Sequence, residues 1–159
     1  MEKINWRELL RSLGRSLGVG VVSALLTMDG MEQYQMMYRP PLSPPGWLFP
    51  VVWTILYTLM GISSARIYII GKETGEDVSQ PLKIYSLQLA VNFAWSLLFF
   101  NMQAFLLSFI WLVFLWVLIY VMIKQFEKVD SFSAKLQIPY LLWVTFAGYL
   151  NFMIWFLNR

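Results

Sequence analysis

The feature that most constrains this chain is a very long stretch without charge. No charged side chain occurs from Ile84 to Ile123, about twice the roughly 20 residues that one transmembrane helix needs. Pro40–Ala65 and Leu136–Asn158 are also uncharged, and only 13% of all residues carry a charge, against about 25% in soluble domains. Because backbone polar groups in lipid must be bonded internally, these runs predict an all-α integral membrane protein.

The polar segments divide the chain into five predicted spans. The short segment Asn101-Met-Gln103 splits the longest uncharged run, while 71–81 and 125–135 form polar links. A long loop over 29–46 is polar at first and then rich in proline. We therefore predict one domain over 1–159, a bundle with spans at about 12–28, 47–70, 82–100, 104–123 and 138–157.

The first span is open to two interpretations. Lys3, Arg7, Arg11 and Arg15 recur every four residues and form one basic helical stripe. The uncharged run that follows, 16–28, is short, so a span requires Arg15 to extend its charge to the interface. The alternative is an amphipathic helix that lies on the membrane surface.

Basic residues are unevenly distributed between the two sides of such a bundle. Two of them, Arg39 and Arg159, fall on one side, and ten fall on the other: Lys3, Arg7, Arg11, Arg15, Arg66, Lys72, Lys83, Lys124, Lys128 and Lys135. Because cytoplasmic loops carry an excess of Lys and Arg, the N-terminus is predicted to be cytoplasmic. This bias fits a bacterial inner membrane.

Several function classes are disfavoured by residues that the chain lacks. It has no histidine and no cysteine, which removes the commonest metal ligands and general base, so no metal site is predicted. The uncharged runs offer no ion or proton path. The basic residues flank apolar runs instead of forming a nucleic-acid surface, and no bound cofactor is required.

Three predicted helices each carry aromatic or amide residues on one face. Such faces could line a pocket for a flat apolar ligand, since Asn is costly toward lipid. The alternatives are interfacial aromatic belts, simple packing and amide bonds between helices. The residues concerned are Trp53 and Tyr57, then Asn92, Trp95 and Phe99, and finally Tyr140, Trp143, Ala147 and Asn151.

A second face of the 82–100 helix carries two small residues. Ala90 and Ala94 form a small-xxx-small pair, which lets helix backbones approach closely. They point away from Asn92 and Trp95 at about 100° per residue. We therefore predict a homodimer through this helix.

Three motifs carry a resemblance to a known family. They read Arg39-Pro40 with Pro44-Pro45-Gly46-Trp47 and Trp53-Thr-Ile-Leu-Tyr57, then Asn92-Phe-Ala-Trp95-Ser-Leu-Leu-Phe99-Phe100, then Pro139-Tyr140-Leu-Leu-Trp143-Val-Thr-Phe146-Ala147-Gly-Tyr149-Leu150-Asn151. In this order and spacing the chain resembles the tryptophan-rich sensory protein family, also called TspO or the translocator (peripheral benzodiazepine receptor) family. One departure is Gln33-Tyr34, where the family usually has Trp-Tyr, so the first loop loses one aromatic ring.

The resemblance implies a five-helix bundle, often dimeric, with a pocket beneath the first loop that binds porphyrins. It implies that Trp53 and Trp143 are the pocket tryptophans, and that Tyr57, Asn92, Trp95 and Ala147 line the same pocket. Some members are reported to promote light-dependent breakdown of protoporphyrin, and others are described as regulators or transport aids. Three functions therefore stay open for this chain: a regulatory or sensory binder, a light-dependent porphyrin degrader and a passive transporter.

The expected ligand is protoporphyrin IX or a related tetrapyrrole. Indole and phenol rings would bury the faces of the disc, with Asn92 and Asn151 at its polar edges. Arg39 is the candidate partner for a propionate, since Arg suits carboxylates; the alternative is a solvated loop charge. With no histidine for axial ligation of iron, a free-base porphyrin is favoured over haem.

Overall fold

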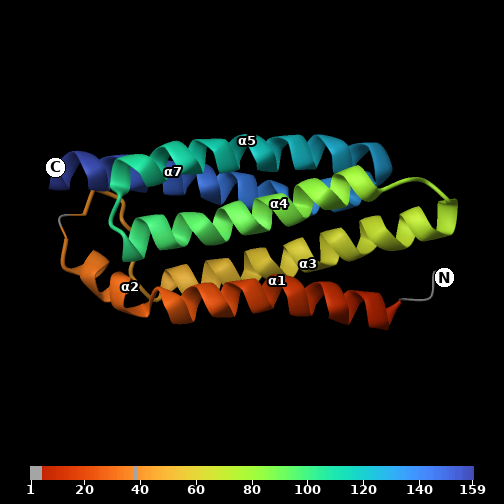
Figure 1. Cartoon of the computed structure of the whole chain (residues 1–159), viewed down its shortest axis with the longest axis horizontal. Coiled ribbons are helices and arrows are strands. Elements are labelled where there is room, and N and C mark those ends of the chain that lie inside the picture. Colours follow the sequence, from red (N-terminus) through yellow and green to blue (C-terminus); the bar gives the residue numbers. More distant parts are fainter. Residues whose placement is uncertain (1–4, 38) are drawn as a thin grey trace.

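The protein is an elongated bundle of helices in the computed structural model, which describes residues 5–37 and 39–159 (Figure 1). Five of these helices are long and apolar enough to cross a membrane, and no strand occurs in the described ranges. The predicted all-α fold with five membrane-spanning helices is confirmed. Lys3, the first residue of the predicted basic stripe, lies outside the described residues.

Helix α1 (Trp6–Leu26) runs alongside α3 (Leu48–Thr74) instead of lying across the end of the bundle (Figure 1). Small residues allow this close contact: the Ser16 hydroxyl donates a hydrogen bond to the Tyr57 carbonyl at 2.8 Å, and a Cβ at Gly61 would lie 2.7 Å from Ser16 Oγ. The course of α1 supports the spanning interpretation over the surface helix. It begins before residue 12 because Asn5 caps it, accepting a bond from the Glu8 N–H at 3.3 Å.

The links at one end are shorter than predicted. Helix α3 continues to Thr74 and stops at Gly75, which has φ +74° and suits a left-handed cap. Helix α4 (Ser79–Ser96) begins soon after. The polar link 125–135 is itself mostly helical, because α5 (Phe105–Val129) and the short α6 (Ser131–Leu136) occupy most of it before α7 (Ile138–Asn158).

The predicted loop over 29–46 is also wrong in its first part. Residues Met28–Gln35 form helix α2, which is separated from α1 by Thr27. Asp29 lies in its first turn, where a negative charge is favourable. Gly30 packs tightly on the α4 side, since a Cβ there would lie 2.4 Å from the Phe100 carbonyl oxygen. Tertiary contact with Phe100 therefore supports a helix that the polar sequence did not suggest.

The last turn of the predicted 82–100 span is a π-helical turn, which is wider than a turn of α-helix. Leu97–Asn101 form one π-helical turn, closed by a bond from the Met102 N–H to the Leu97 carbonyl at 3.0 Å. A π turn shifts the register of the side chains that follow it. Phe99 and Phe100 consequently lie beside α2, whose Tyr34 ring is 5.7 Å and 5.9 Å from theirs.

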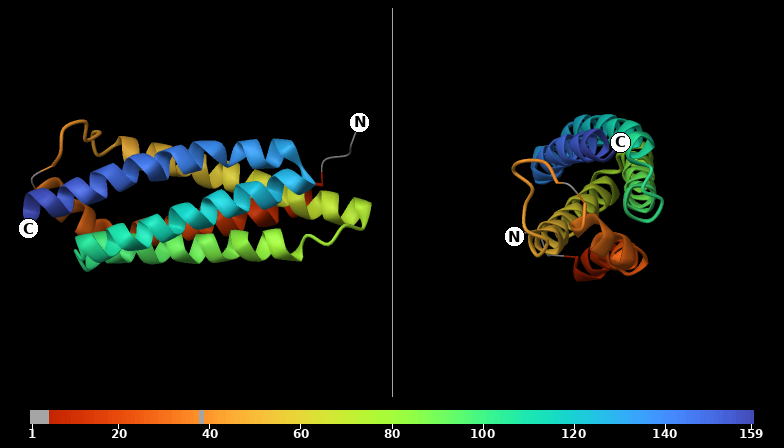
Figure 2. Two further views of the ribbon diagram at one scale, coloured as in Figure 1. Left: turned by 90° about the horizontal axis from the view of Figure 1, so that it is seen from above. Right: turned by 90° about the vertical axis from the view of Figure 1, so that its left-hand side faces the viewer.

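The two ends of the bundle differ. We call the end that holds α2 and loop residues 39–47 the lid end, and the end that holds the α3–α4 link and α6 the basic end (Figures 1 and 2). Helix α1 starts at the basic end and α7 finishes at the lid end (Figure 1). Lys72, Lys83, Lys128 and Lys135 all lie in or beside segments at the basic end.

Candidate functional site

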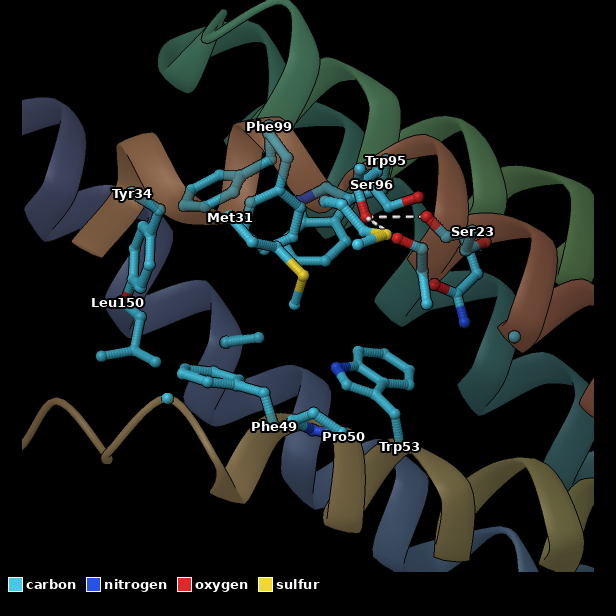
Figure 3. A pocket seen from close by; sticks show the side chains of 18 of the residues that line it. Ser23, Met31, Tyr34, Phe49, Pro50, Trp53, Trp95, Ser96, Phe99 and Leu150 are labelled. Carbon is cyan, nitrogen blue, oxygen red and sulfur yellow. Dashed lines mark hydrogen bonds between the residues drawn. The ribbon is translucent and has the colours of Figure 1, made fainter. Parts of the chain in front are cut away.

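A cavity of about 330 Å³ lies within the lid-end half of the bundle (Figure 3). Its wall combines α1, α2, α3, the α4–π segment and α7, so residues far apart in the sequence share it. Figure 3 shows the Trp53 ring pointing into this space from α3, with Met31 and Phe99 on the opposite side. The wall is overwhelmingly apolar and aromatic.

Most of the predicted ligand-binding residues meet at this cavity. The structure brings together eight of them from α3, the α4–π segment and α7: Trp53, Tyr57, Asn92, Trp95, Phe99, Trp143, Ala147 and Asn151. Their shared position follows from the helical period, which places residues three or four apart on one face. The two remaining candidates, Tyr140 and Arg39, are outside the lining.

Tyr140 lies behind the wall, so its prediction as a lining residue needs correction. It is 1% exposed, and its hydroxyl accepts a bond from Asn92 Nδ2 at 3.0 Å and donates one to Gln88 Oε1 at 2.7 Å. A buried phenol needs such partners. Tyr140 therefore positions Asn92, and its ring packs 6.3 Å from that of Trp53.

Arg39 is exposed in the lid loop and does not line the cavity. Its charge still acts on the cavity's mouth. Burial raises the pKa of the Tyr34 hydroxyl above its usual range, and the positive charge of Arg39 partly opposes this. Tyr34 does line the cavity, so Arg39 is an electrostatic neighbour of the site and not part of its wall.

The Asn151 side chain lines the cavity, but protein groups already bond its amide. Its oxygen accepts bonds from Trp95 Nε1 at 3.0 Å and Ser108 Oγ at 3.1 Å, and its nitrogen donates to the Phe105 carbonyl at 2.8 Å. The predicted alternative, an amide that joins helices, describes this geometry. Asn151 thus fixes the orientation of the Trp95 ring at the cavity wall.

Polar groups with spare bonding capacity gather at one end of the cavity. The side chains of Ser23, Tyr57 and Asn92 lie close together at the cavity wall. Figure 3 shows Ser23 on the far side of the cavity from Tyr34 and Leu150. Ser23 Oγ and the indole N–H of Trp143 are buried, and neither has a partner among the described residues. Buried polar groups are rarely left unpaired. A ligand with hydrogen-bonding groups could supply these bonds.

Ring pairs hold the aromatic wall in place. The Trp95 and Phe99 rings stack at 5.3 Å, and the Trp53 and Tyr57 rings lie 5.7 Å apart at 33°. Phe49 meets Trp143 edge to face at 5.9 Å. Offset and edge-to-face pairs of this kind favour fixed orientations, so the cavity has a defined shape before any ligand binds.

The lid closes one end of the cavity. Met31 and Tyr34 reach it from α2, and the Tyr34 ring meets Phe49 edge to face at 6.1 Å. The lid loop is tied down by Tyr149 of α7, whose hydroxyl donates to the Pro41 carbonyl at 2.8 Å. Gln103 Nε2 of the α4–α5 turn donates a hydrogen bond to Gln33 Oε1. Gln33, which stands where the family usually has Trp, therefore ties α2 to this turn through its side-chain amide.

Sequence reasoning missed the contribution of α1. Gly20, Ser23, Ala24 and Thr27 line the cavity, at positions i, i+3, i+4 and i+7 of one helix face. This stripe of small and polar residues could have indicated a helix face that lines a pocket. It was missed because the search for pocket residues relied on aromatic and amide side chains. Its small size matters, because a Cβ at Gly20 would lie 2.7 Å from the Tyr57 ring.

The predicted dimer face points away from the cavity. Ala90 is exposed and Ala94 is partly exposed on the outer side of α4, next to Leu87, which is 48% exposed. This surface could meet lipid or a second copy. The homodimer stays a prediction.

The chemistry of the cavity follows from the groups that line it among the described residues. No three His, Cys, Asp or Glu side chains among them cluster to hold a metal ion. The lining has no charged side chain. Chemically, the site can enclose a flat apolar molecule and offer it a few hydrogen bonds at one edge.

Comparison with known proteins identifies relatives of this chain across kingdoms. The TspO/MBR family matches residues 12–156. The chain is 37% identical to the tryptophan-rich protein TspO of Chlorobaculum tepidum over 92% of each chain. It is 32% identical to the tryptophan-rich sensory protein of Cereibacter sphaeroides over 98% of this chain and 94% of the relative, and 34% identical to the translocator protein of Bos taurus over 92% and 85%. The chain therefore belongs to the TspO/MBR family.

Proposed function

We propose that this membrane protein binds a porphyrin or related tetrapyrrole in the aromatic cavity beneath its lid and has a regulatory or sensory role in tetrapyrrole handling. One observation carries the proposal: three tryptophans from three helices, Trp53, Trp95 and Trp143, line one cavity. Indole faces suit a flat apolar disc, and each aromatic pair adds roughly 0.5–1.5 kcal/mol beyond area burial. The porphyrin ligands implied by the resemblance have this shape.

The size of the cavity bears on how such a ligand would enter. At about 330 Å³ it is near the lower limit of the roughly 300–1,000 Å³ that is usual for small-molecule sites. A tetrapyrrole with its propionates would therefore require the lid to move outward. Its propionates would then project at the mouth, where Arg39 is the proposed partner.

The first test is a titration of purified protein in detergent with protoporphyrin IX, followed by tryptophan fluorescence. We expect saturable quenching in the wild type. In a Trp53→Phe, Trp143→Phe double variant the affinity for protoporphyrin IX should fall at least tenfold, which corresponds to about 1.4 kcal/mol of binding free energy. Trp116→Phe is the matched control, because Trp116 is 36% exposed on α5, away from the cavity. Quenching that is non-saturable, or equal in all three proteins, would contradict the proposal.

The second candidate is light-dependent degradation of bound porphyrin. The observation that favours it is the position of Trp53 and Trp143 at the cavity, with the Trp143 N–H unpaired among the described groups. A bound porphyrin would touch oxidisable indoles. Illumination of the complex should then bleach the porphyrin absorbance, and Trp143→Phe should abolish bleaching at equal occupancy. Stable absorbance under light would leave the binding role alone.

The orientation and the assembly are part of the same proposal. We place the basic end in the cytoplasm of a bacterial cell with the protein in its inner membrane, and a second copy against Ala90 and Ala94. Because the chain has no cysteine, single reporters are clean: Glu76→Cys in the α3–α4 link should resist an external thiol reagent, and Leu42→Cys in the lid loop should react. Reversed labelling would overturn the orientation.

Ala94→Phe should convert a dimer to monomers on gel filtration.

A further inference from the structure

A ladder of buried hydrogen bonds leads from the cavity toward the basic end. Helices α4 and α7 run in the same direction (Figure 1). Asn92 Nδ2 donates to the Tyr140 hydroxyl at 3.0 Å, which donates to Gln88 Oε1 at 2.7 Å, and Gln88 Nε2 contacts Met60 Sδ at 4.0 Å. Each polar side chain in this ladder has a protein partner.

One helical turn nearer the basic end, the pairing stops. Tyr85 precedes Gln88 by three residues, and Gln137 precedes Tyr140 by three, so both belong to the same level of the parallel pair. Tyr85 is 6% exposed and Gln137 is 0% exposed. Within the described ranges the Tyr85 hydroxyl and both amide atoms of Gln137 have no hydrogen-bond partner.

Three unpaired buried atoms at one level require an explanation. A buried donor or acceptor without a partner loses its bonds to water and gains nothing in return. Native proteins keep very few such groups, and those that occur usually mark water or an ion. Apolar side chains of similar shape would fit these positions at lower cost.

The surroundings of this level are polar. The hydroxyls of Ser16 and Ser64 lie near that of Tyr85, and Ser63 donates to the Ser133 carbonyl at 2.8 Å close by in sequence. Arg15 is the charged group that acts on Tyr85. The positive charge of Arg15 disfavours a cation near Tyr85. The Gln137 amide has both a donor and an acceptor without a partner among the described residues, so the setting suits a neutral ligand that both donates and accepts.

We infer that Tyr85 and Gln137 hold buried water between α4 and α7, in the half of the bundle toward the basic end. Neither residue lines the aromatic cavity, so this hydrated site is separate from it. A buried water makes about three hydrogen bonds, which matches the phenol oxygen, the amide oxygen and the amide nitrogen. The ladder through Gln88, Tyr140 and Asn92 then joins the water to the cavity floor.

Radiolytic footprinting of the full chain in nanodiscs tests the water directly. X-rays split buried water in place, whereas radicals from photolysed peroxide arrive from bulk solvent. We expect Tyr85 to be oxidised several-fold faster than Tyr140 under X-rays, but no faster from peroxide, and the X-ray signal to fall in Gln137→Leu. Equal rates for Tyr85 and Tyr140 under X-rays would overturn the inference, as would equal labelling of Tyr85 from both sources.

A stability measurement gives a second, independent readout. In a dry site Tyr85→Phe removes an unpaired hydroxyl, so the Tm should stay or rise. In a hydrated site the same change removes a bond to water, and the Tm should fall. The matched control is Tyr120→Phe, at an exposed position on α5 that should change nothing. A Tm that is equal or higher in Tyr85→Phe would contradict buried water even if Gln137 variants fail to fold.

Discussion

The two ends of the bundle are each held by one polar node that binds three groups, but the nodes differ in charge. Toward the lid end, Asn151 bonds Trp95, Ser108 and the Phe105 carbonyl, and it is 0% exposed. At the basic end, Asp130 accepts bonds from Arg66 Nε at 3.0 Å, Ser133 N–H at 3.1 Å and Ser133 Oγ at 2.6 Å, and its side chain is 17% exposed.

The difference shows how the membrane selects the chemistry of each node. A charged side chain inside a bilayer is costly, so a neutral amide joins α4, α5 and α7 within the spans. At the membrane surface a carboxylate remains ionised, and there Asp130 joins α3 to α6 and caps α6. The neutral node also serves the site, because it orients Trp95, whereas the charged node does not touch the cavity.

The largest effect is expected from Asn151→Leu. This change leaves the Trp95 N–H, the Ser108 hydroxyl and the Phe105 carbonyl without their partner, at a cost of about 2–4 kcal/mol. Unfolding in SDS at fixed lipid content would measure it, with Phe152→Leu on the exposed neighbouring surface as control. A variant as resistant to SDS as the wild type would show that the neutral node is dispensable.

A smaller loss is expected from Asp130→Ala. Loss of the helix cap and of a partly exposed ion pair should lower the free energy of unfolding by about 1–2 kcal/mol. Affinity for protoporphyrin IX should not change, because Asp130 is remote from the cavity. Weaker porphyrin binding in this variant would contradict the conclusion that the basic end contributes to stability but not to ligand binding.

Acid should act on the basic end alone. Burial by itself would raise the pKa of Asp130, but bonds from Ser133 and Arg66 outweigh it and hold that pKa below its usual range. The stabilisation is thus present above the unfolded-state pKa, about 3.9, and is lost as pH falls through the lower folded value. Melting curves from pH 7 to pH 3 should show a loss in the wild type that Asp130→Asn removes. Parallel curves would mean that another group dominates.

The smallest effect is expected from Tyr149→Phe. The change removes one partly exposed bond to the lid loop, worth about 0.5–1 kcal/mol, and leaves the ring contacts in place. Bound porphyrin should dissociate a few-fold faster with little change in Tm, as stopped-flow fluorescence would record. Unchanged dissociation would show that α2, rather than the loop, retains the ligand.

Particular residues show how far the sequence could anticipate the site. Trp53, Trp95 and Trp143 were placed at one pocket because each lies on the aromatic face of its helix. Tyr140 shares such a face, yet it lies behind Asn92, because hydrogen bonding to Gln88 holds its hydroxyl away from the cavity. Helix α2 was missed, since its polar residues fold against Phe100, which no local pattern reveals.

The sequence by itself determined five membrane-spanning helices, the side of the bundle that is basic and the three aromatic faces. Uncharged length, the distribution of Lys and Arg and a period of 3.6 residues are local properties, and lipid leaves the backbone no alternative to the helix. Only the tertiary structure decided which polar atoms found partners. Asn151 became saturated, while Ser23 and Trp143 remained open to the cavity, because hydrogen bonds between helices depend on how the helices pack and not on the sequence of any one of them.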